Sequence, residues 1–586
     1  MKYSDHLAEW LLQLGYDRCF FVGGGNIMHL IESISRRMPC NAVIHEVAAG
    51  IAAEYYNETS TSGRAFALVT AGPGLTNIVS AMAGAFLESR ELLVIGGQVK
   101  TADLAHGRVR QRGIQEVDGV SIVRPVCKSA VLLTECVSFH TFGSLALESR
   151  SGRKGPVFIE IPLDIQAREY TSESQGDAPV EASPLPKASK ADVDSTISRL
   201  RNAERPLFLL GGGLDRGVVS SVLDRLTSAG IPVATTWNGA DRIASDHPVF
   251  VGRPNTWGQR SANLVLQQAD LLIALGTRLG MQQTGFNWQE FLPGGQVVQV
   301  DIDAAELSKG HPRVDLPICA DANDFLIRVL NGDLGNHRDW LGYARKVRST
   351  IPLIEDVNVT REGFISPYVF VDELSMQCTP TDLVIPCSSG GAFTVMMQTF
   401  SLKQGQVMVT NKGLASMGYG LSAAIGASFR HPDRRVVLVE GDGGFAQSMQ
   451  EIGTAKVNNL NIKVFVFDDS GYASIRMTQR SYFGGRYVGC DTQTGLGLPR
   501  WDKLFQAWDM PTCRLGPGYA SDSEFIRLFN GNGIAAFIVS IDPEQTYFPK
   551  ITSRITETGA MVSNPLHLMT PELPAELRAT VLQYIG

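Results

Sequence analysis

VVLVEGDGGFAQSMQEIGTAKVNNLNIKVFVFDDSGYASIRMTQR, residues 436–480, contains the two motifs that indicate the fold of this chain. An apolar, β-branched run at residues 436–440 ends in GDGG at 441–444. A second such run, residues 463–467, ends in DDSG at 468–471. Each run predicts a buried strand, and the segment between them predicts a crossover helix. Two parallel strands connected in this way bring both acidic turns to the same carboxyl edge of a sheet.

The two acidic turns together predict a site for a metal ion and a diphosphate. Asp442 and Asp469 are 27 positions apart, about the length of one βαβ unit. Two hard carboxylates at one sheet edge suit a hard cation, and Gly443 and Gly444 let backbone N–H groups approach a phosphate at the following helix start. GDGG alone is equally consistent with an ordinary turn, so the prediction depends on the pair.

GDG followed, some two dozen residues later, by a polar pair resembles the signature of thiamine diphosphate (ThDP) enzymes. The family usually has Asn-Asn where this chain has Asp468-Asp469, a departure that keeps the oxygen ligand and adds negative charge. The resemblance implies that Mg²⁺ is held by the carboxylates of Asp442 and Asp469 and by the backbone carbonyl of Gly471.

Length and composition exclude several other classes of protein. At 586 residues, with 44% hydrophobic and 19% charged residues, the chain fits about three globular domains. A net charge of −7 without a basic block argues against nucleic acid and membranes as partners. The nine cysteines form no C-x-x-C pair, and the N-terminus reads as an amphipathic helix, not a signal peptide. We therefore expect a cytoplasmic protein without disulfides.

The chain divides into three blocks of alternating strand and helix patterns. We expect an α/β fold with three doubly wound parallel-sheet domains, followed by a tail that covers the site. The resemblance names the domains as pyrimidine-binding (1–170), central FAD-type (190–332) and diphosphate-binding (366–550), with the tail at 551–586. Two stretches look like linkers, 170–192 and 331–367.

The first block resembles the pyrimidine-binding domain of ThDP enzymes. The stretches that carry the resemblance are a Gly-rich turn, His-Glu before a small-residue helix, and T-x-GPG-x-TN. The resemblance implies that Glu46 hydrogen-bonds N1′ of the aminopyrimidine and so activates the cofactor. From the residues alone, a solvated carboxylate at a helix start is the favoured interpretation of Glu46. The expected cofactor contacts are Gly25, Thr70, Gly72 and Asn77.

Residues 110–130, RQRGIQEVDGVSIVRPVCKSA, resemble the acetolactate synthase stretch around F-Q-E and a later lysine. Gln115 and Lys128 match, whereas Ile114 stands where the aromatic residue is expected. The resemblance places Gln115 and Lys128 near the donor 2-oxo acid, as catalytic residues. A surface lysine is the alternative for Lys128.

The second block resembles the FAD-binding central domain of acetolactate synthase. It contains three Gly-ended strands, a Thr-Thr strand end, a G-x-R turn and D-I-D. The implied FAD contacts are Gly211, Gly212, Gly213, Thr236, Gly276, Thr277, Arg278, Asp301 and Asp303. Gly280 and Met281 replace the acidic pair that follows the arginine in the family. A central domain that keeps the fold and binds nothing is the alternative.

The third block contains two further turns that resemble the cofactor site. CSSGGA at 387–392 is a diphosphate-type turn, and NKGLASMGYG resembles the family's G-G-L-G-T-M-G-F-G. The resemblance implies that Met417 props the cofactor into its bent shape and that the carbonyl of Ala415 accepts from N4′–H. Ile475 would be a bulky neighbour of the thiazolium. The remaining predicted contacts here are Gly390, Gly391, Ala392, Gly443 and Gly444.

The resemblance as a whole implies a carboligase of the acetolactate synthase type, with ThDP, Mg²⁺ and a structural FAD, in a homodimer or dimer of dimers. Pyruvate would be the donor and a carbonyl compound the acceptor. Thr478 stands where the family has a Trp in the acceptor pocket, so we expect a larger acceptor, for example a nucleotide-linked keto-deoxysugar as in the yersiniose pathway. Arg476 could bind an acceptor phosphate or be a solvated helix arginine. A C–C bond hydrolase acting on a cyclic dione and a non-catalytic regulatory homologue are the alternatives.

Overall fold

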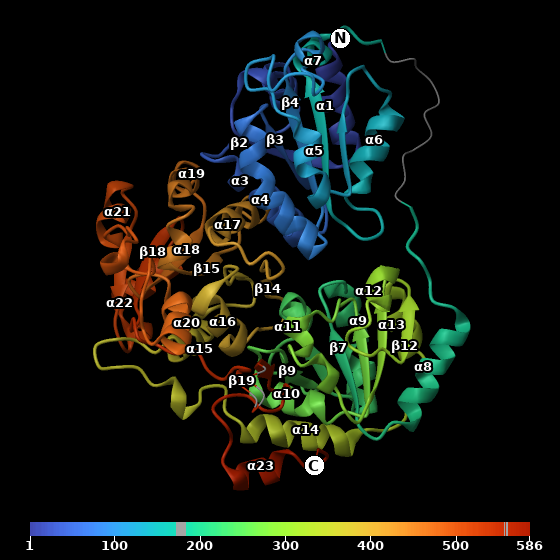
Figure 1. The fold of residues 1–586 in the computed structure, drawn as a ribbon, viewed down its shortest axis with the longest axis vertical. Coiled ribbons are helices and arrows are strands. Elements are labelled where there is room, and N and C mark those ends of the chain that lie inside the picture. The colour runs from blue at the N-terminus through green and yellow to red at the C-terminus, as the bar shows by residue number, and fades with distance from the viewer. Residues whose placement is uncertain (172–182, 556, 558, 560, 586) are drawn as a thin grey trace.

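The computed structural model describes residues 1–171, 183–555, 557, 559 and 561–585. The described residues form three parallel six-stranded sheets with helices packed on their faces (Figure 1). This architecture confirms the predicted α/β class with three parallel sheets. Of the predicted linker 170–192, residues 172–182 lie outside the described residues.

The first sheet has the strand order β2-β1-β3-β4-β6-β5. Its strands are β1 (Tyr16–Phe21), β2 (Cys40–Ala42), β3 (Arg64–Val69), β4 (Leu92–Gln98), β5 (Ser129–Leu132) and β6 (Pro156–Pro162). Its helices are α1 (Tyr3–Gln13), α2 (Met28–Ser35), α3 (Glu46–Thr59), α4 (Pro73–Glu88), α5 (Gly119–Val123), α6 (Phe139–Glu148) and α7 (Leu163–Ala167). Neighbouring residues of β3 enter different apolar clusters, Phe66 on one face and Ala67 on the other. Both faces are therefore covered, which explains why these strands read as continuous apolar runs.

The second sheet has the order β12-β11-β10-β7-β8-β9. Its strands are β7 (Pro206–Leu210), β8 (Val233–Thr235), β9 (Phe250–Gly252), β10 (Leu271–Leu275), β11 (Gln296–Asp301) and β12 (Leu316–Cys319). Its helices are α8 (Lys190–Asn202), α9 (Arg216–Ala229), α10 (Arg260–Gln267), α11 (Met281–Thr284), α12 (Ala304–Ser308), α13 (Ala322–Leu330) and α14 (Arg338–Thr350). Helix α14 lies inside the predicted linker 331–367. That prediction is wrong there, because Trp340 is buried and its indole N–H donates to the carbonyl of Pro206 at 2.9 Å.

The third sheet has the order β14-β13-β15-β16-β18-β17. Its strands are β13 (Leu383–Ile385), β14 (Val407–Met408), β15 (Val436–Gly441), β16 (Ile462–Asp468), β17 (Thr512–Leu515) and β18 (Ala535–Ser540). Its helices are α15 (Pro367–Gln377), α16 (Gly390–Thr399), α17 (Tyr419–Arg430), α18 (Asp442–Phe445), α19 (Ile452–Val457), α20 (Ala473–Phe483), α21 (Trp501–Ala507) and α22 (Ser523–Asn530). Strands β15 and β16 pair in parallel, with Gly441 opposite Phe467. The prediction that both acidic turns reach one carboxyl edge is therefore confirmed.

One apolar cluster joins the first and third sheets. It contains α3 and α4 residues together with Tyr419 and Ile425 of α17 and strand residues of both sheets. Gly426 of α17 lies so close to α3 that an added Cβ would meet the carbonyl oxygen of Ala52 at 2.1 Å. The first and third sheets therefore share a core.

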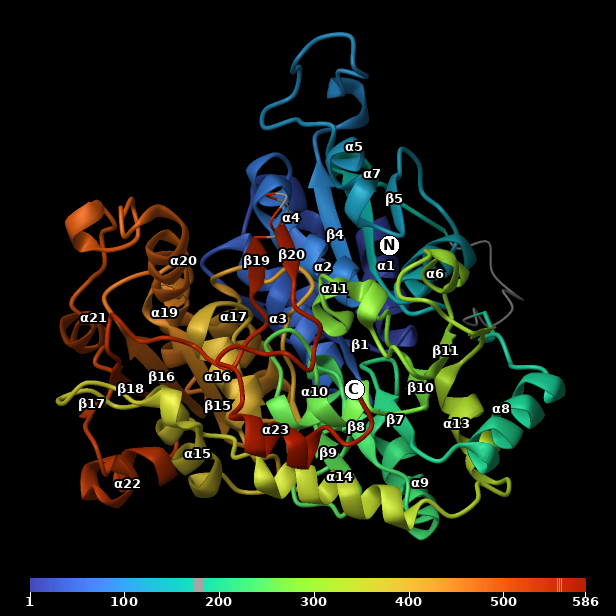
Figure 2. The same cartoon turned by 60° about the horizontal axis from the view of Figure 1, so that its bottom comes forward.

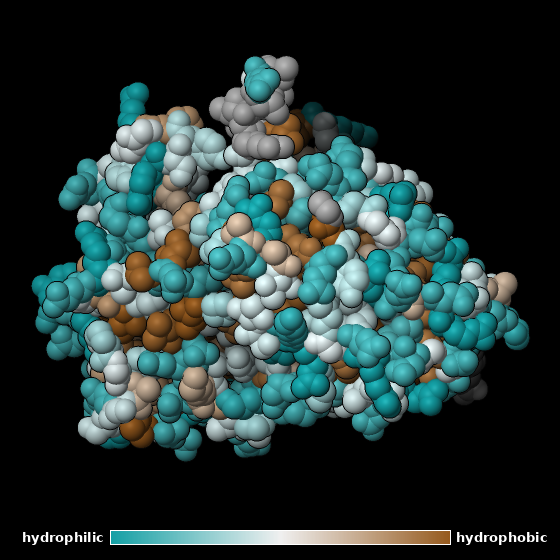
Figure 3. Space-filling view, turned by 90° about the horizontal axis from the view of Figure 1, so that it is seen from below, coloured by the Kyte–Doolittle hydropathy of each residue, from teal (hydrophilic) through white to brown (hydrophobic). Residues whose placement is uncertain are grey.

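The tail forms an antiparallel hairpin, β19 (Ser553–Ile555) with β20 (Met561–Ser563), and then α23 (Ala575–Val581). Helix α23 lies beside α14 (Figure 1), and the side chain of Gln268 donates to the carbonyl of Val581 at 2.9 Å. Helix α23, which follows the stretch expected to cover the site, packs on the second sheet's helices. The face that carries α14 and α23 is mostly hydrophilic with scattered apolar patches (Figure 3).

Among the described helices, none combines the length and apolar character that a membrane crossing requires.

Candidate active site

Glu46 lies at the carboxyl edge of the first sheet, as the first residue of α3. Its Oε2 accepts a hydrogen bond of 2.9 Å from the Nδ2 of Asn77, on the first turn of α4. Only 8% of Glu46 is exposed, whereas Asn77 is exposed. The amide therefore fixes one carboxylate oxygen and leaves the other for a ligand.

Glu451 holds the backbone that leads into Glu46, and the sequence analysis missed it. Its carboxylate accepts from the N–H of Ile44 at 3.1 Å and of His45 at 3.0 Å, and it is fully buried. Glu451 comes from the third sheet's connections, some 400 positions along the chain, so no local pattern could indicate this contact.

Three turns pack together around this edge. An added Cβ on Gly24 would meet the Cβ of Thr70 at 2.3 Å, and one on Gly72 would meet the carbonyl oxygen of Gln115 at 2.3 Å. Gly25 faces open space, and among the described residues the buried Oγ1 of Thr70 has no hydrogen-bond partner. An unpaired hydroxyl beside an open glycine fits a polar ligand at this edge.

Gln115 and Lys128 do not lie together. Gln115 is exposed and its carbonyl oxygen lies against Gly72; it belongs to the connection between β4 and α5, which extends away from the molecule (Figure 2). Lys128 precedes β5, and its N–H donates to the carbonyl of Pro156 at the start of β6. All strands of this sheet are parallel, so Lys128 lies at the amino edge, opposite Glu46. Its ammonium donates to the carbonyl of Ser151 at 2.6 Å, so within one chain grouping it with Glu46 is wrong.

Asp442 and Asp469 lie together at the carboxyl edge of the third sheet. Asp442 is fully buried, and its carboxylate accepts from the N–H groups of Gly443 at 2.6 Å and Gly471 at 3.0 Å. Burial, followed by the nearby charge of Asp469, raises the pKa of Asp442 well above its usual range. Two buried carboxylates that repel each other fit a cation between them.

No group of three or more His, Cys, Asp or Glu side chains suited to a metal occurs in the part of the chain that the structure describes. The predicted site has only two such side chains, so a metal there needs further oxygens from the backbone and from a ligand. A diphosphate supplies such oxygens.

Arg476 is part of this carboxylate cluster. Its Nη2 lies 2.8 Å from the Oδ1 of Asp469 and 2.7 Å from the Asp469 carbonyl, and it is 2% exposed. Burial raises the pKa of Asp469 to about 7, and the charge of Arg476 opposes that rise. Because this guanidinium is already occupied, neither the predicted contact to an acceptor phosphate nor a solvated arginine fits its position.

Two turns of the third sheet meet beside this cluster. The hydroxyl of Ser388 donates to the carbonyl of Ser416, which brings the predicted diphosphate turn to the segment before α17. Ala415 has a left-handed backbone, with φ of 54°, and Met417 is 38% exposed. Gly390, with φ of 80°, has nothing within 4 Å of an added Cβ. Of the predicted residues here, Gly390 and Met417 face open space, whereas Ala392 is buried.

Helix α20 exposes the predicted substrate face and buries the opposite one. Ile475 is 45% exposed and Thr478 is exposed, whereas Arg476 and Met477 are buried. The Thr478 hydroxyl donates to the carbonyl of Ser474 at 2.9 Å, one turn earlier. Ile475 and Thr478 are three residues apart and so share one side of the helix.

Helix α17, which follows the Met417 segment, contacts α3 at a distance from Glu46. The hydroxyl of Tyr419 donates to Glu54, about 12 Å along α3 from Glu46 at 1.5 Å per residue. Met417 lies two residues before Tyr419 in the sequence.

The second sheet borders a cavity of about 400 Å³ that also touches the other two sheets' segments. Its lining includes most of the predicted FAD residues, namely Gly212, Gly213, Thr236, Gly276, Thr277, Arg278 and Asp301. Gly211 has no room for a side chain, because its Cβ would meet the carbonyl oxygen of Gly276 at 2.2 Å. Asp301 ends β11, where dinucleotide folds place an acceptor for ribose hydroxyls. The cavity thus fits a dinucleotide-type ligand.

Asp303 does not line this cavity. Its carboxylate pairs with Arg153 and caps α12 by accepting from the N–H of Ala305 at 2.9 Å. Asp303 is therefore occupied by the protein, contrary to its predicted role as a flavin contact.

Glu88, at the end of α4, lies where the three sheets meet. It accepts from the Asn238 side chain and from the N–H groups of Lys412 and Gly413. The Lys412 ammonium lies 5.0 Å from the ring centroid of Trp237, and both residues line the cavity. Burial lowers the pKa of Lys412 to about 8.

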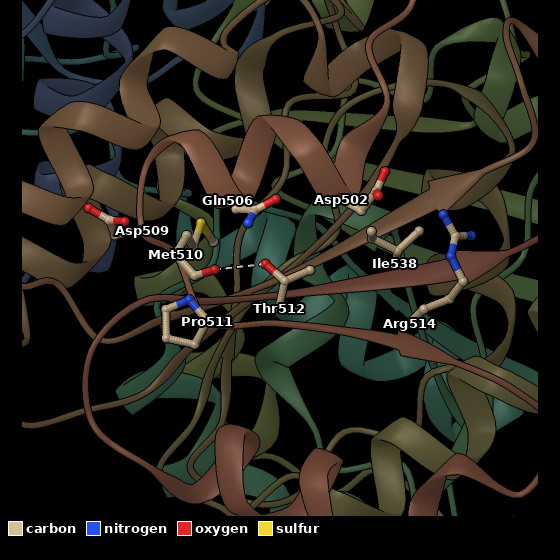
Figure 4. A pocket seen from close by; sticks show the side chains of 8 residues that line it. All are labelled: Asp502, Gln506, Asp509, Met510, Pro511, Thr512, Arg514 and Ile538. Atoms are coloured by element: carbon tan, nitrogen blue, oxygen red, sulfur yellow. Dashed lines mark hydrogen bonds between the residues drawn. The ribbon is translucent and has the colours of Figure 1, made fainter.

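A second cavity, of about 570 Å³, lies between α21 and β17. Figure 4 shows the side chains that line it, among them Asp502, Arg514 and Thr512, whose hydroxyl donates to the Met510 carbonyl at 2.8 Å. It contains none of the predicted cofactor residues, and we assign it no role in the site.

Sequence models of three domain types match the chain. "Thiamine pyrophosphate enzyme, N-terminal TPP binding domain" matches residues 1–122, the "central domain" matches residues 193–329, and the "C-terminal TPP binding domain" matches residues 389–537. The three models follow one another in the order of the three sheets.

Curated relatives cover most of the chain. The acetolactate synthase isozyme 1 large subunit of Escherichia coli strain K12 is 28% identical over 558 residues, 94% of this chain and 95% of the relative. The acetolactate synthase large subunit of Corynebacterium glutamicum is 29% identical over 507 residues, 83% of this chain and 78% of the relative. With three matched domains in order and relatives along most of its length, the chain belongs to the thiamine diphosphate-dependent enzymes of the acetolactate synthase and pyruvate oxidase family.

Proposed function

We propose that this enzyme is a ThDP-dependent carboligase, which decarboxylates a 2-oxo acid such as pyruvate and transfers the acyl unit to a carbonyl acceptor. The observation that carries the proposal is the pair of half-sites in one chain: Glu46 fixed by Asn77, and Asp442 beside Asp469. Relatives named as acetolactate synthases support the reaction type.

The residues present fit ThDP and Mg²⁺. Asp442, Asp469 and the carbonyl of Gly471 would hold the metal, and the N–H groups at the start of α16 would face the diphosphate. Bound ThDP supplies a nucleophilic carbon that accepts the acyl unit of a 2-oxo acid. The role of Glu46 is to hold and return a proton at N1′, and Met417 supports the bent shape of the cofactor.

We propose FAD as the occupant of the 400 Å³ cavity, with Arg278 near its phosphates and Asp301 at a ribose. Acyl transfer involves no net oxidation or reduction, so the flavin has a structural role. The support is the Gly-rich lining at the ends of β7 and β10 together with the carboxylate of Asp301, whose Oδ1 accepts from the N–H of Asp303 at 3.0 Å.

We propose an acceptor larger than pyruvate, because Thr478 exposes a short side chain beside Ile475 on α20. A nucleotide-linked keto-deoxysugar is such an acceptor. Because Arg476 donates to Asp469, a different basic side chain would have to bind the phosphates of such an acceptor.

The smallest working unit in this proposal is a homodimer, alone or as a dimer of dimers. It is supported by the contact of Tyr419, two residues after Met417, with Glu54, which lies about 12 Å along α3 from Glu46 in the same chain. In a dimer, the first block of one copy meets the third block of the other.

The direct test is product analysis with pyruvate and a panel of aldehyde and ketone acceptors. We expect CO₂ release and ligated products. Cleavage of a cyclic dione without ligation would establish the hydrolase alternative instead. Asp442→Ala should lose ThDP binding in calorimetry while remaining folded, whereas Asp502→Ala on α21, away from the site, should bind normally. Absence of ThDP binding in the unaltered protein would favour a regulatory homologue.

A further inference from the structure

Tyr547 reaches the predicted diphosphate turn from the segment after β18. It is 2% exposed, and an added Cβ on Gly391 would meet its Cζ at 2.1 Å and its hydroxyl oxygen at 2.4 Å. The ring therefore occupies the space that any side chain at position 391 would need. The turn and the tyrosine fit each other only because Gly391 has no side chain.

Tyr547 is buried as a residue, but its hydroxyl oxygen is not among the fully buried atoms that lack a partner, so it keeps a little accessible surface, and it donates to no other residue within the described parts of the chain. Two other buried tyrosines of this region have one. The hydroxyl of Tyr368 donates to the carbonyl of Phe548 at 2.6 Å, and that of Tyr519 donates to the carbonyl of Phe370 at 3.0 Å. A buried phenol normally finds an acceptor, so the missing acceptor at Tyr547 points to a ligand.

The carboxylate cluster lies close to this hydroxyl. Burial and then the charges of Asp469 and Asp442 raise the pKa of Tyr547, and the charge of Arg476 lowers it. The phenol is bordered by Gly391, and the charges of both predicted metal ligands act on it. The turn that contains Gly391 is where the diphosphate is expected.

The diphosphate turn itself offers few side-chain donors. Residues 389–392 are Ser-Gly-Gly-Ala, so only Ser389 carries a polar side chain. Backbone N–H groups at the start of α16 are the other donors. The Tyr547 ring lies against Gly391, so its hydroxyl adds a hydrogen-bond donor beside a position of the turn that has no side chain of its own.

We propose that Tyr547 is a cofactor-binding residue whose hydroxyl donates a hydrogen bond to a diphosphate oxygen of ThDP. The proposal rests on the proposed function of the site. It assigns to the segment after β18 a direct part in holding the cofactor.

The test is Tyr547→Phe, with Tyr519→Phe as the matched control, because both variants remove one buried hydroxyl from the same domain. Calorimetric titration with Mg²⁺–ThDP gives the dissociation constant, and thermal denaturation of the apo-protein gives the stability. We expect a roughly 10- to 100-fold weaker binding of ThDP in Tyr547→Phe, the range for a hydrogen bond to a charged group. Tyr519→Phe should bind ThDP as the unaltered protein does.

The melting temperature of the apo-protein shows whether the Tyr547 hydroxyl stabilises the fold in the absence of ThDP. Tyr547→Phe should leave the melting temperature unchanged or higher, because it removes a hydroxyl without an internal partner, whereas Tyr519→Phe should lower it. Equal ThDP affinity in Tyr547→Phe and the unaltered protein would overturn the inference and leave the proposed function intact. A lower melting temperature of apo Tyr547→Phe, similar to that of the control, would also overturn it. Failure of the unaltered protein to bind ThDP would instead remove the proposed function and this inference with it.

Discussion

The guanidinium of Arg476 lies against the carboxylate of Asp469, with 2.8 Å between Nη2 and Oδ1, and both side chains are buried. In the apo-protein this arginine supplies the positive charge beside the two carboxylates. The predicted metal would add a second one. The pair therefore links the stability of the third domain to the occupation of its metal site.

Arg476→Met should destabilise the apo-protein, because it leaves Asp469 buried without a partner. We expect a loss of about 3–5 kcal/mol in the free energy of unfolding, measured by urea denaturation. Mg²⁺–ThDP should restore more stability to the variant than it adds to the unaltered protein. Arg500→Met, which breaks an exposed pair with Asp502, is the control and should change little. Equal effects of the two substitutions would contradict the role of Arg476.

Glu46→Gln should fold and bind ThDP but should lose activation of the cofactor. The amide can still accept from Asn77 but cannot hold a proton for N1′. We expect hydrogen–deuterium exchange at C2 of bound ThDP, followed by NMR, to slow by at least 100-fold, in line with the loss of a general acid–base group. An unchanged exchange rate would exclude Glu46 as the activator.

The purified protein should be yellow, release FAD on denaturation, and turn over without reducing the flavin. Asp301→Ala should weaken FAD binding about tenfold or more, because it removes the carboxylate that lines the cavity at the end of β11. Asp303→Ala is the matched control two residues away, where the carboxylate is already used by Arg153. Absorbance at flavin wavelengths after gel filtration measures both. A colourless protein that does not take up added FAD would contradict the assignment.

Thr478→Trp should narrow the acceptor range. An indole on the exposed side of α20 occupies space beside Ile475 that a bulky ketone would need. We expect pyruvate decarboxylation to continue, ligation to bulky ketones to fall by 10-fold or more in kcat/KM, and ligation to a second pyruvate to survive. Equal losses with small and large acceptors would show that position 478 does not border the acceptor.

Glu160 should make stability depend on pH. It is 2% exposed, accepts a hydrogen bond from Gln98 at 3.1 Å, and burial raises its pKa to about 8 from an ordinary 4.5. Between pH 4.5 and about 8, Glu160 therefore binds more protons in the folded state than in the unfolded state. The contribution of its protonated form to the free energy of unfolding is complete below pH 4.5 and is lost as the pH rises to about 8. Glu160→Gln should reduce this slope by about 1 kcal/mol per pH unit in urea denaturation between those limits. An identical slope in the variant would exclude Glu160 as the cause.

The sequence was sufficient to predict the α/β class and the meeting of the two acidic turns, because strand periodicity and Gly-Asp turns are local signals. Glu46 and Asn77 were each named from local motifs, but their hydrogen bond was not predicted. The pairing of Arg476 with Asp469 and the contact of Glu451 with the backbone before Glu46 were not predicted either, since each depends on side-chain directions or on segments far apart in the chain. Lys128 was misplaced because a motif match does not show which edge of the sheet a residue occupies.

Glu88, which lines the central cavity, connects the three blocks by hydrogen bonds. From the end of α4, its carboxylate accepts from the side chain of Asn238 in the second block. It also accepts from the N–H groups of Lys412 and Gly413 in the third block. Lys412 lines the cavity and lies five residues before Met417, in the same segment between β14 and α17. A nucleotide bound in the cavity would contact segments of all three blocks. Through Lys412 it would help to fix the position of Met417, the residue proposed to support the thiamine ring. If FAD occupies this cavity as proposed, it would contribute to the architecture of the enzyme without exchanging electrons.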